Sequence, residues 1–289
     1  MNEPDFIAAL RSIATHRAAR SLADDAAVLE LNGESLVVTH DAMVEGRHWL
    51  PGQDMADVAW KLVAVNLSDL AAKGAEPLGV LIGHTLGDGD ARFLEGLREV
   101  LEAYGVPLLG GDTVAGHGAR TLGCTALGRA SHRPVPSRAG ARPGDHVYVT
   151  GTVGLAMLGF EALRDRMGAD SIAYRRPAPR LMEGRALAPI VTAMMDISDG
   201  LLLDAWRLAE ASGVTLAIAG NDVPVTEAAR RRECLSWGDD YELLFTAPAE
   251  MALPLDAYCI GIVQPRTDAP LVLDGEPFSQ AQGLGYQHG

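Results

Sequence analysis

The sequence predicts an α/β protein of two domains, and three observations support this fold class. Short apolar runs rich in β-branched residues alternate with longer helical patterns, which is typical of mixed α/β architectures. A chain of 289 residues is long enough for two domains. The segment 131–145 holds three prolines and two glycines, as expected of a link between domains. We therefore expect domains at 1–135 and 136–289, with an α+β arrangement in the N-terminal half.

The expected elements follow from the periodicity of the apolar residues. Strands are predicted where β-branched residues form short runs between turn signals, at 35–39, 107–109, 146–150, 215–219, 242–246 and 258–263. Helices are predicted where apolar residues recur at helical spacing over longer stretches, at 55–73, 92–104, 154–167 and 199–211.

Composition excludes several classes of function. The chain carries 24 basic and 38 acidic residues, a formal net charge of −14, whereas binding to nucleic acid or to an anionic membrane requires a basic face. No apolar run reaches the roughly 18–20 residues of a membrane span, and residues 1–5 show no apolar signal core. The three cysteines lie far apart, which favours a reduced, cytoplasmic protein.

Several common catalytic motifs do not occur in the sequence. The lysines are Lys61 and Lys73, and neither lies in the G-x-x-x-x-G-K-[ST] pattern of a P-loop. The G-x-S-x-G and G-x-G-x-x-G patterns are also missing, so neither a nucleophilic serine elbow nor a Rossmann loop is predicted. No cysteine has a histidine close by in the sequence to activate it, and covalent catalysis is not expected.

Acidic residues instead gather where the predicted strands and helices begin or end. They are Asp24, Asp25, Asp41, Asp69, Asp112, Asp196, Asp199, Asp239 and Asp240. Each alone could serve as an ordinary turn or cap residue. Together they could hold several Mg²⁺ ions, because Mg²⁺ prefers carboxylates, waters and substrate phosphates as ligands. Zinc chemistry is less favoured, since H-E-x-x-H does not occur.

The predicted helix 55–73 carries three polar residues within one narrow sector, namely Asn66, Asp69 and Lys73. Its other faces are rich in alanine, valine and leucine, so a carboxylate there should need a partner such as a cation. The alternative is a solvated stripe in which Asp69 pairs with Lys73 at i,i+4. Both interpretations stay open at this point.

Two glycine-containing turns and one arginine suit phosphate binding. Residues 110–113 (GGDT) follow a predicted strand and allow close backbone approach. Residues 150–154 (TGTVG) join a predicted strand to a helix whose N-terminal amides favour an anion. Arg138, in the expected interdomain segment, could clamp a phosphate or could equally be a solvated charge.

Taken in this order, seven segments resemble the thiamine-monophosphate kinases: ADDAAV at 23–28, THDAMVEGRHW at 39–49, VNLSDLAAKGAEP at 65–77, GGDT at 110–113, SRAGARPGD at 137–145, DISDG at 196–200 and GDDYEL at 238–243. That family is part of a superfamily with aminoimidazole ribonucleotide synthetase and selenophosphate synthetase. The MVEGRHW and DDYEL segments point to the thiamine-phosphate branch. The resemblance runs from near residue 20 to the C-terminus. It implies an aminoimidazole ribonucleotide synthetase-like fold that dimerises through its N-terminal domain.

The resemblance also implies roles for individual residues. It implies metal positions at Asp25, Thr39, His40, Asp41, Asp69, Asp112, Asp196 and Asp199, with His40 acting through its backbone. It implies ATP contacts at Tyr104, Gly111, Asp112, Arg138 and Ser198. It implies contacts with the thiamine phosphate at His48 and Asp239, and it leaves Tyr286 as a third substrate contact.

The sequence departs from the family pattern at three places. Ala23 stands where the family has glycine before the two aspartates, which should spare the metal ligand. Asp239 stands where the family has glutamate, so a substrate-contacting carboxylate is shorter by one methylene. Gly283 falls near an expected aromatic position, and Tyr286 is the nearby ring. The last two changes concern recognition of the thiamine ring more than the chemistry.

The implied reaction is ATP-dependent phosphorylation of thiamine monophosphate to thiamine diphosphate, without a phosphoenzyme. The phosphate of the acceptor is already ionised near pH 7, so no general base is strictly needed. Several Mg²⁺ ions would bridge the two polyanions and support in-line transfer. The expected partners are therefore ATP, thiamine monophosphate and a second copy of the chain.

Two alternatives stay open. A sister enzyme could use similar carboxylates on another acceptor, such as a formylglycinamidine ribonucleotide. Selenophosphate synthesis is disfavoured, because no cysteine lies in the N-terminal segment. A non-catalytic metal or nucleotide sensor, from a different class of protein, would bind ATP with Mg²⁺ but release no ADP.

Overall fold

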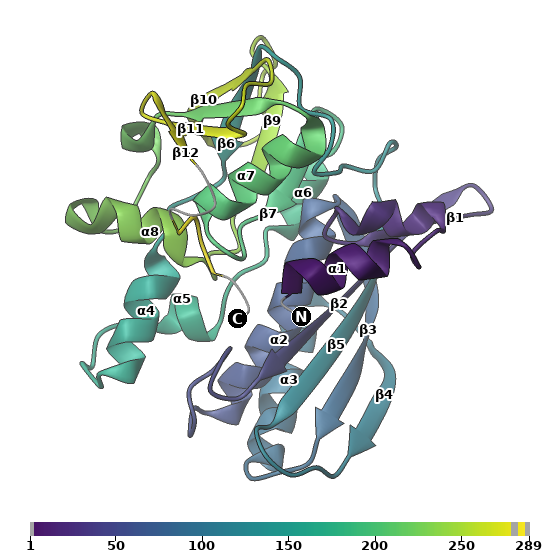
Figure 1. Cartoon of the computed structure of the whole chain (residues 1–289). Coiled ribbons are helices and arrows are strands. Elements are labelled where there is room, and N and C mark those ends of the chain that lie inside the picture. Colours follow the sequence, from purple (N-terminus) through teal and green to yellow (C-terminus); the bar gives the residue numbers. More distant parts are fainter. Residues whose placement is uncertain (1–2, 279–282, 287–289) are drawn as a thin grey trace.

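The computed structural model describes residues 3–278 and 283–286 and is built around two β-sheets (Figure 1). The first half of the chain forms α1 (Glu3–Arg11), η1 (Arg17–Leu22), β1 (Ala27–Leu31), β2 (Glu34–Val44), α2 (Met55–Ala72), β3 (Ala75–Thr85), α3 (Asp90–Tyr104), β4 (Leu108–Val114) and β5 (Thr121–Ala130). The second half forms β6 (Asp145–Val149), α4 (Leu155–Arg164), α5 (Ile172–Arg175), α6 (Leu181–Leu187), β7 (Ala193–Asp196), α7 (Leu201–Ser212), β8 (Thr215–Ile218), η2 (Gly220–Asp222), η3 (Ala228–Arg230), α8 (Arg231–Trp237), β9 (Leu243–Pro248), β10 (Tyr258–Gln264), β11 (Leu271–Leu273) and β12 (Glu276–Phe278).

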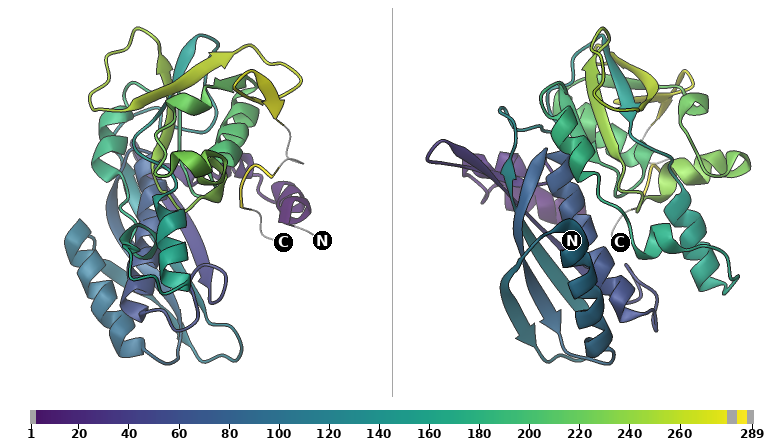
Figure 2. Two further views of the ribbon diagram at one scale, coloured as in Figure 1. Left: turned by 90° about the vertical axis from the view of Figure 1, so that its left-hand side faces the viewer. Right: turned by 180° about the vertical axis from the view of Figure 1, so that it is seen from behind.

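The first sheet has the strand order β1-β2-β5-β3-β4, and its strands are antiparallel except for the parallel pair β3 and β4. Helices α2 and α3 pack against each other beside this sheet (Figures 1 and 2). Val80 and Ile82 of β3 are buried in the same core as α2, whereas Leu81 between them is exposed. Because side chains alternate along a strand, Leu81 lies on the opposite face of the sheet.

The second sheet has the order β12-β11-β8-β10-β6-β9-β7, and it is antiparallel except for the pair β8 and β11. Its core is formed by strand residues such as Val147 and Leu216 together with Leu202 and Leu208 of α7. The leucines of α7 are spaced to place one apolar face of the helix against the sheet. The start of α7 is thereby fixed next to the end of β7.

Helix α2 lies between the two halves, and nearly all of its residues are buried. One side packs on β2, β3 and β5, and its C-terminal part packs on α6 and β7. The contact with α6 is so close that a Cβ added at Gly184 would lie 2.0 Å from the carbonyl oxygen of Ala71. A glycine is therefore required there, and the close approach brings Asp69 of α2 opposite Asp196 at the end of β7.

The structure confirms every strand and helix that the periodicity predicts, with changes at their ends. The predicted strands correspond to β2, β4, β6, β8, β9 and β10, and the predicted helices to α2, α3, α4 and α7. The helix predicted at 154–167 ends at Arg164, and the helix predicted at 199–211 begins only at Leu201. Strand β2 is longer than predicted, because its pairing with β5 continues to Val44.

Two central strands, β3 and β5, are not among the sequence predictions. Strand β3 contains Pro77 and Gly79, and its register with both neighbours shifts in this region. Strand β5 contains Gly123 and Gly128. Proline and glycine weaken the local strand signal, so pairing with distant strands decides these two elements.

Residues 131–144 join β5 to β6 and so connect one sheet to the other. The division of the chain at residue 135 stays a prediction. Among the helices of the described residues, none combines the length and the hydropathy that crossing a bilayer requires.

Candidate functional site

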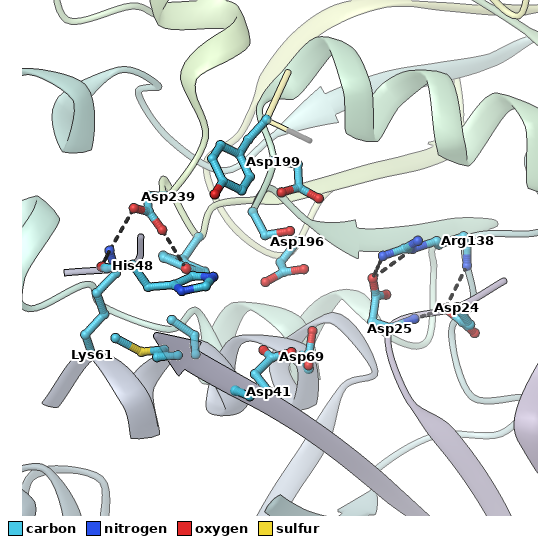
Figure 3. A pocket seen from close by; sticks show the side chains of 16 residues that line it. Asp24, Asp25, Asp41, His48, Lys61, Asp69, Arg138, Asp196, Asp199 and Asp239 are labelled. Carbon is cyan, nitrogen blue, oxygen red and sulfur yellow. Dashed lines mark hydrogen bonds and ion pairs between the residues drawn. The ribbon is translucent and has the colours of Figure 1, made fainter. Parts of the chain in front are cut away.

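An acidic cavity of about 480 Å³ lies where α2 and β2 of the first half meet the loops after β7 and α8 of the second (Figure 3). It is lined by Asp24, Asp25, Asp41, Ala42, Met43, His48, Lys61, Val65, Asp69, Arg138, Asp196, Ser198, Asp199, Asp239, Tyr241 and Tyr286. Seven of these sixteen residues are aspartates, which is far more negative charge than a cavity wall can hold without bound cations or internal pairing.

Three carboxylates form the centre of the site. One oxygen from each of Asp25, Asp69 and Asp196 lies within 4.8 Å of the other two. Asp69 accepts a hydrogen bond from the Thr39 hydroxyl, and Asp196 accepts one of 2.6 Å from the Ser68 hydroxyl. These side chains come from the segment before β1, from α2 and from the end of β7, so the cluster exists only because the two halves are packed together.

Burial and the nearby negative charges both raise the pKa values of the cluster. Burial raises the pKa of Asp69 well above its usual range, and the charges of Asp41, Asp196 and Asp25 raise it further. Burial, followed by the charge of Asp25, raises the pKa of Asp196 to about 8. A hard divalent cation among these oxygens would remove both effects, since it favours the ionised form. The donor set therefore fits Mg²⁺.

Basic side chains neutralise the neighbouring part of the cavity. Arg138 donates from Nε and Nη2 to Oδ1 of Asp25, at 2.8 and 2.5 Å. The fully buried Lys73 lies with its Nζ 2.5 Å from Oδ2 of Asp25 and also pairs with Asp24. Burial alone would raise the pKa of Asp24, but Lys73 and Arg20 outweigh it and hold this pKa well below its usual range.

Lys73 thus pairs with two carboxylates that lie far from it in the sequence. The interpretation of a solvated stripe on helix 55–73 is wrong, because Asn66, Asp69 and Lys73 are all buried. The other interpretation, that a carboxylate on this helix needs a partner such as a cation, stays a prediction, since the contact described for Asp69 is the Thr39 hydroxyl.

The loop after β7 is shaped by an aspartate that is not among the predicted site residues. Asp204 of α7 accepts hydrogen bonds from the backbone N–H groups of Ser198 and Asp199, at 3.1 and 3.0 Å. Burial and the charge of Asp199 raise the pKa of Asp204 to about 7. Arg207 pairs with both Asp199 and Asp204. Asp204 directly follows three leucines near the start of the predicted helix 199–211, and a carboxylate in so apolar a stretch is the signal that could have identified this role.

At the opposite end of the cavity, Lys61 of α2 pairs with Asp239, with 2.7 Å between Nζ and Oδ2. Lys61 also donates to the carbonyl oxygen of His48 at 3.3 Å. The other oxygen of Asp239 accepts a hydrogen bond of 2.8 Å from the Tyr241 hydroxyl. Lys61 is not among the predicted site residues, although a lysine on an otherwise apolar helix is a signal of such a role.

Ten of the predicted site residues line this one cavity. They are Asp25, Asp41, His48, Asp69, Arg138, Asp196, Ser198, Asp199, Asp239 and Tyr286. Tyr286 is held there because its backbone N–H donates to the carbonyl oxygen of Asp199 at 2.9 Å. Thr39 lies behind the cavity and contacts Asp69, whereas the His40 ring bonds with the Thr125 hydroxyl at 2.8 Å.

Three of the predicted ATP contacts, Tyr104, Gly111 and Asp112, lie outside this cavity. Gly111 and Asp112 are on β4 and line a separate cavity with residues of β3 and α3. Asp112 pairs with Gly83 of β3, Gly83 pairs with Gly123 of β5, and Gly123 pairs with Ala42 of β2. Asp112 therefore lies three strand spacings, or roughly 14 Å, from Ala42. Tyr104 packs edge-on against Trp60, with 5.9 Å between ring centroids. Within one chain, Asp112 therefore does not reach the carboxylate cluster.

Family models match both halves of the chain. The N-terminal domain of AIR synthase related proteins matches residues 23–130, and the C-terminal domain of the same proteins matches residues 142–269. These matches and the two-sheet fold define the chain as an AIR synthase related protein.

Individual relatives show which family of AIR synthase related proteins the chain belongs to. The thiamine-monophosphate kinase of Escherichia coli K12 is 36% identical over 301 residues, covering 92% of this chain and 91% of that one. The thiamine-monophosphate kinase of Caulobacter vibrioides is 39% identical over 248 residues, covering 78% and 70%. A solved structure described as AaThiL complexed with AMPPCP and TMP has a TM-score of 0.90 at 29% identity and covers 100% of this chain and 97% of that one. The chain belongs to the thiamine-monophosphate kinase family, as the resemblance predicts.

Proposed function

We propose that this chain transfers the γ-phosphoryl group of ATP directly to thiamine monophosphate, giving thiamine diphosphate and ADP. The observation that carries the proposal is the cluster of Asp25, Asp69 and Asp196 in a cavity with Arg138 on one side and Asp239 on the other. Relatives at 36% and 39% identity carry the same activity in their names, and the similar AaThiL structure holds an ATP analogue and TMP.

The metal ligands proposed for this chain are the carboxylates of Asp25, Asp69 and Asp196, with Asp41 and Asp199 completing the acidic wall. When bound, Mg²⁺ would offset the negative charge of the two phosphate groups and hold them for in-line transfer. The Arg138 guanidinium can bind phosphate oxygens as a planar fork once it turns from Asp25. His48 and Asp239, which line the other end of the cavity, are the proposed contacts of the acceptor.

No side chain is needed to remove a proton from the acceptor, because a phosphate monoester has its second pKa near 6 and is ionised at neutral pH. The protein therefore contributes to catalysis by holding the phosphates of ATP and of the acceptor close together and aligned. Buried hydroxyls of Thr39 and Ser68 fix the orientation of Asp69 and Asp196 for this purpose.

The test is chromatography of a reaction containing the purified protein, MgCl₂, ATP and thiamine monophosphate. We expect thiamine diphosphate and ADP in equal amounts, and we expect neither product when Mg²⁺ is chelated or ATP is omitted. ADP formation with a different acceptor would assign a sister reaction instead. ATP binding without any ADP release would contradict an enzymatic function.

The proposal includes a homodimer formed through the first sheet. Leu81 and Leu109 are exposed on the face of β3 and β4 that α2 and α3 do not cover, and Leu109 packs over Gly79. Val114, at the end of the same edge strand, is also exposed. Contiguous exposed apolar side chains of this kind mark protein interfaces.

Replacing Leu109 with glutamate should convert the dimer into a monomer, because a charge would be buried at the interface. Analytical ultracentrifugation of the wild type and of Leu109→Glu measures this directly. The matched control is Met182→Glu, at a residue that is 83% exposed on α6, and it should remain dimeric. A monomeric wild type, or a dimeric Leu109→Glu protein, would contradict the interface. The cytoplasmic location stays a prediction.

A further inference from the structure

An ion pair occupies the end of the cavity that lies away from Arg138. Figure 3 shows Lys61, His48 and Asp239 grouped at that end, with Asp69 and Asp196 between them and Arg138. Nζ of Lys61 lies 2.7 Å from Oδ2 of Asp239. The two charges come from α2 and from the loop after α8, so they belong to the two different halves of the chain.

The ammonium group of Lys61 is buried among groups of the protein. The side chain is 2% exposed, and its Nζ lies 4.0 Å from the centroid of the Tyr174 ring. The Tyr174 hydroxyl donates to the same His48 carbonyl oxygen that accepts from Lys61. Burying an ammonium group is costly, and the carboxylate, the carbonyl and the aromatic face together offset this cost. Lys61 therefore presents a positive charge at the cavity wall that solvent does not screen.

Asp239 is held facing the same space by a constrained loop. Asp239 and Tyr241 have φ values of +58° and +52°, a region that residues other than glycine rarely adopt. A Cβ at Gly238 would lie 2.5 Å from the carbonyl oxygen of Ser198, so the loop sits tightly on the segment after β7. Such local strain is typical of ligand-binding loops. The Asp239 side chain remains 28% exposed to the cavity.

We propose that the bound acceptor separates this ion pair and forms one charge pair with Asp239 and another with Lys61. In this exchange of partners, Lys61 is the residue that binds the phosphate of the acceptor. Thiamine monophosphate carries a permanently cationic ring and an anionic phosphate, the charges opposite to those of Asp239 and Lys61. In the bound state the ring cation replaces Lys61 beside Asp239, and Nζ of Lys61 donates to a phosphate oxygen. This inference rests on the proposed function and adds a substrate-binding residue to it.

Partner exchange makes recognition depend on both charges of the acceptor. A ligand with the cationic ring alone would displace Lys61 from Asp239 and leave a buried ammonium group unpaired. A phosphate ester without the cation would draw Lys61 away and leave Asp239 unpaired. Each case incurs the penalty of an uncompensated charge, so the pair selects for the zwitterion.

The test compares two ligands on the full chain by isothermal titration calorimetry in saturating MgCl₂ without ATP. Thiamine and thiamine monophosphate differ only in the phosphate, so the ratio of their affinities isolates its contribution. In Lys61→Met we expect the affinity for thiamine monophosphate to fall about 10- to 100-fold, the range of a charge-assisted hydrogen bond. The affinity for thiamine should stay within about threefold of the wild type or improve, because Asp239 is released.

Three further variants keep the result interpretable. Lys61→Arg retains the charge and should keep most of the preference for the phosphate-bearing ligand. Asp239→Asn should weaken both ligands by similar factors, because it removes the partner of the ring that they share. Arg98→Gln, which removes a positive charge from the exposed face of α3, is the matched control and should bind both ligands as the wild type does.

Equal losses for both ligands in Lys61→Met would show that Lys61 only supports the loop, and would overturn the inference. An unchanged affinity for thiamine monophosphate would overturn it as well. Failure of the proposed function looks different, since the wild type would then form no thiamine diphosphate from ATP and would bind neither ligand.

Discussion

Replacing Asp69 with asparagine should abolish most activity and at the same time stabilise the metal-free protein. Burial raises the pKa of Asp69 well above the usual range, and the charges of Asp41, Asp196 and Asp25 raise it further. In the absence of Mg²⁺ the neutral amide removes this repulsion and can still accept the hydrogen bond from Thr39. We expect a gain of about 1 kcal/mol in the free energy of unfolding in EDTA.

The loss of activity should be at least about a hundredfold, because the central ligand of the proposed metal cluster contributes several kcal/mol to charge stabilisation. The measurements are the rate of thiamine diphosphate formation in saturating MgCl₂ and the midpoint of thermal unfolding with EDTA or MgCl₂. Mg²⁺ should raise the midpoint of the wild type clearly and that of Asp69→Asn only slightly.

Asp268→Asn is the matched control, since this aspartate lies in an exposed loop before β11. It should behave as the wild type in both measurements. Near-normal turnover of Asp69→Asn at saturating Mg²⁺ would show that Asp69 is not a metal ligand. A lower midpoint for Asp69→Asn in EDTA would contradict the repulsion argument independently of the chemistry.

Replacing Lys73 with methionine should be the most destabilising of the substitutions considered. Lys73 is fully buried, pairs with Asp24 and Asp25, and donates to the carbonyl oxygen of Met194 at 3.4 Å. Burial disfavours the ammonium form, but the charges of Asp25 and Asp24 more than compensate and raise the pKa of Lys73. Its removal leaves two buried carboxylates with only arginine partners, which should cost about 3 kcal/mol.

Thermal unfolding in EDTA measures this effect, and a decrease in the midpoint of roughly 6–12 °C is expected for a chain of this size. Lys73→Arg keeps the charge and should recover part of the loss. Added MgCl₂ should raise the midpoint of Lys73→Met more than that of the wild type, because a divalent cation can then replace the ammonium group. A midpoint within about 2 °C of the wild type in EDTA would show that the network does not depend on Lys73.

The role of α2 illustrates how far local sequence information extends. Its length, its apolar character and the narrow sector of Asn66, Asp69 and Lys73 are all evident from spacing. The need of Asp69 for a cationic environment also follows, since an unpaired carboxylate is costly in an apolar setting. The partners of the two lysines of α2 cannot be predicted from spacing, because they are distant in the sequence. Lys73 pairs with Asp24 over a separation of 49 residues, and Lys61 pairs with Asp239 over a separation of 178 residues.

The predicted ATP and metal contacts show the same limit. The segments with Asp41, Asp69, Asp196 and Asp239 lie in one cavity, whereas Asp112 lies three strands away from β2. Nothing in the GGDT segment indicates this separation, since it arises from the order β2-β5-β3-β4. Two of those strands, β5 and β3, are not predicted from the sequence, because their glycines and proline weaken the periodic pattern of a strand.

The sequence by itself determined the fold class, half of the described α-helices and strands, the order of the carboxylate segments and the family of the chain. These features depend on local periodicity and on residue identity, which are present in any short window of the chain. The tertiary structure alone decided which carboxylates gather, which lysine neutralises them and which predicted contacts lie outside the cavity. Those outcomes depend on sheet order and on the packing of α2 between the two halves, and both join residues that are distant in the sequence.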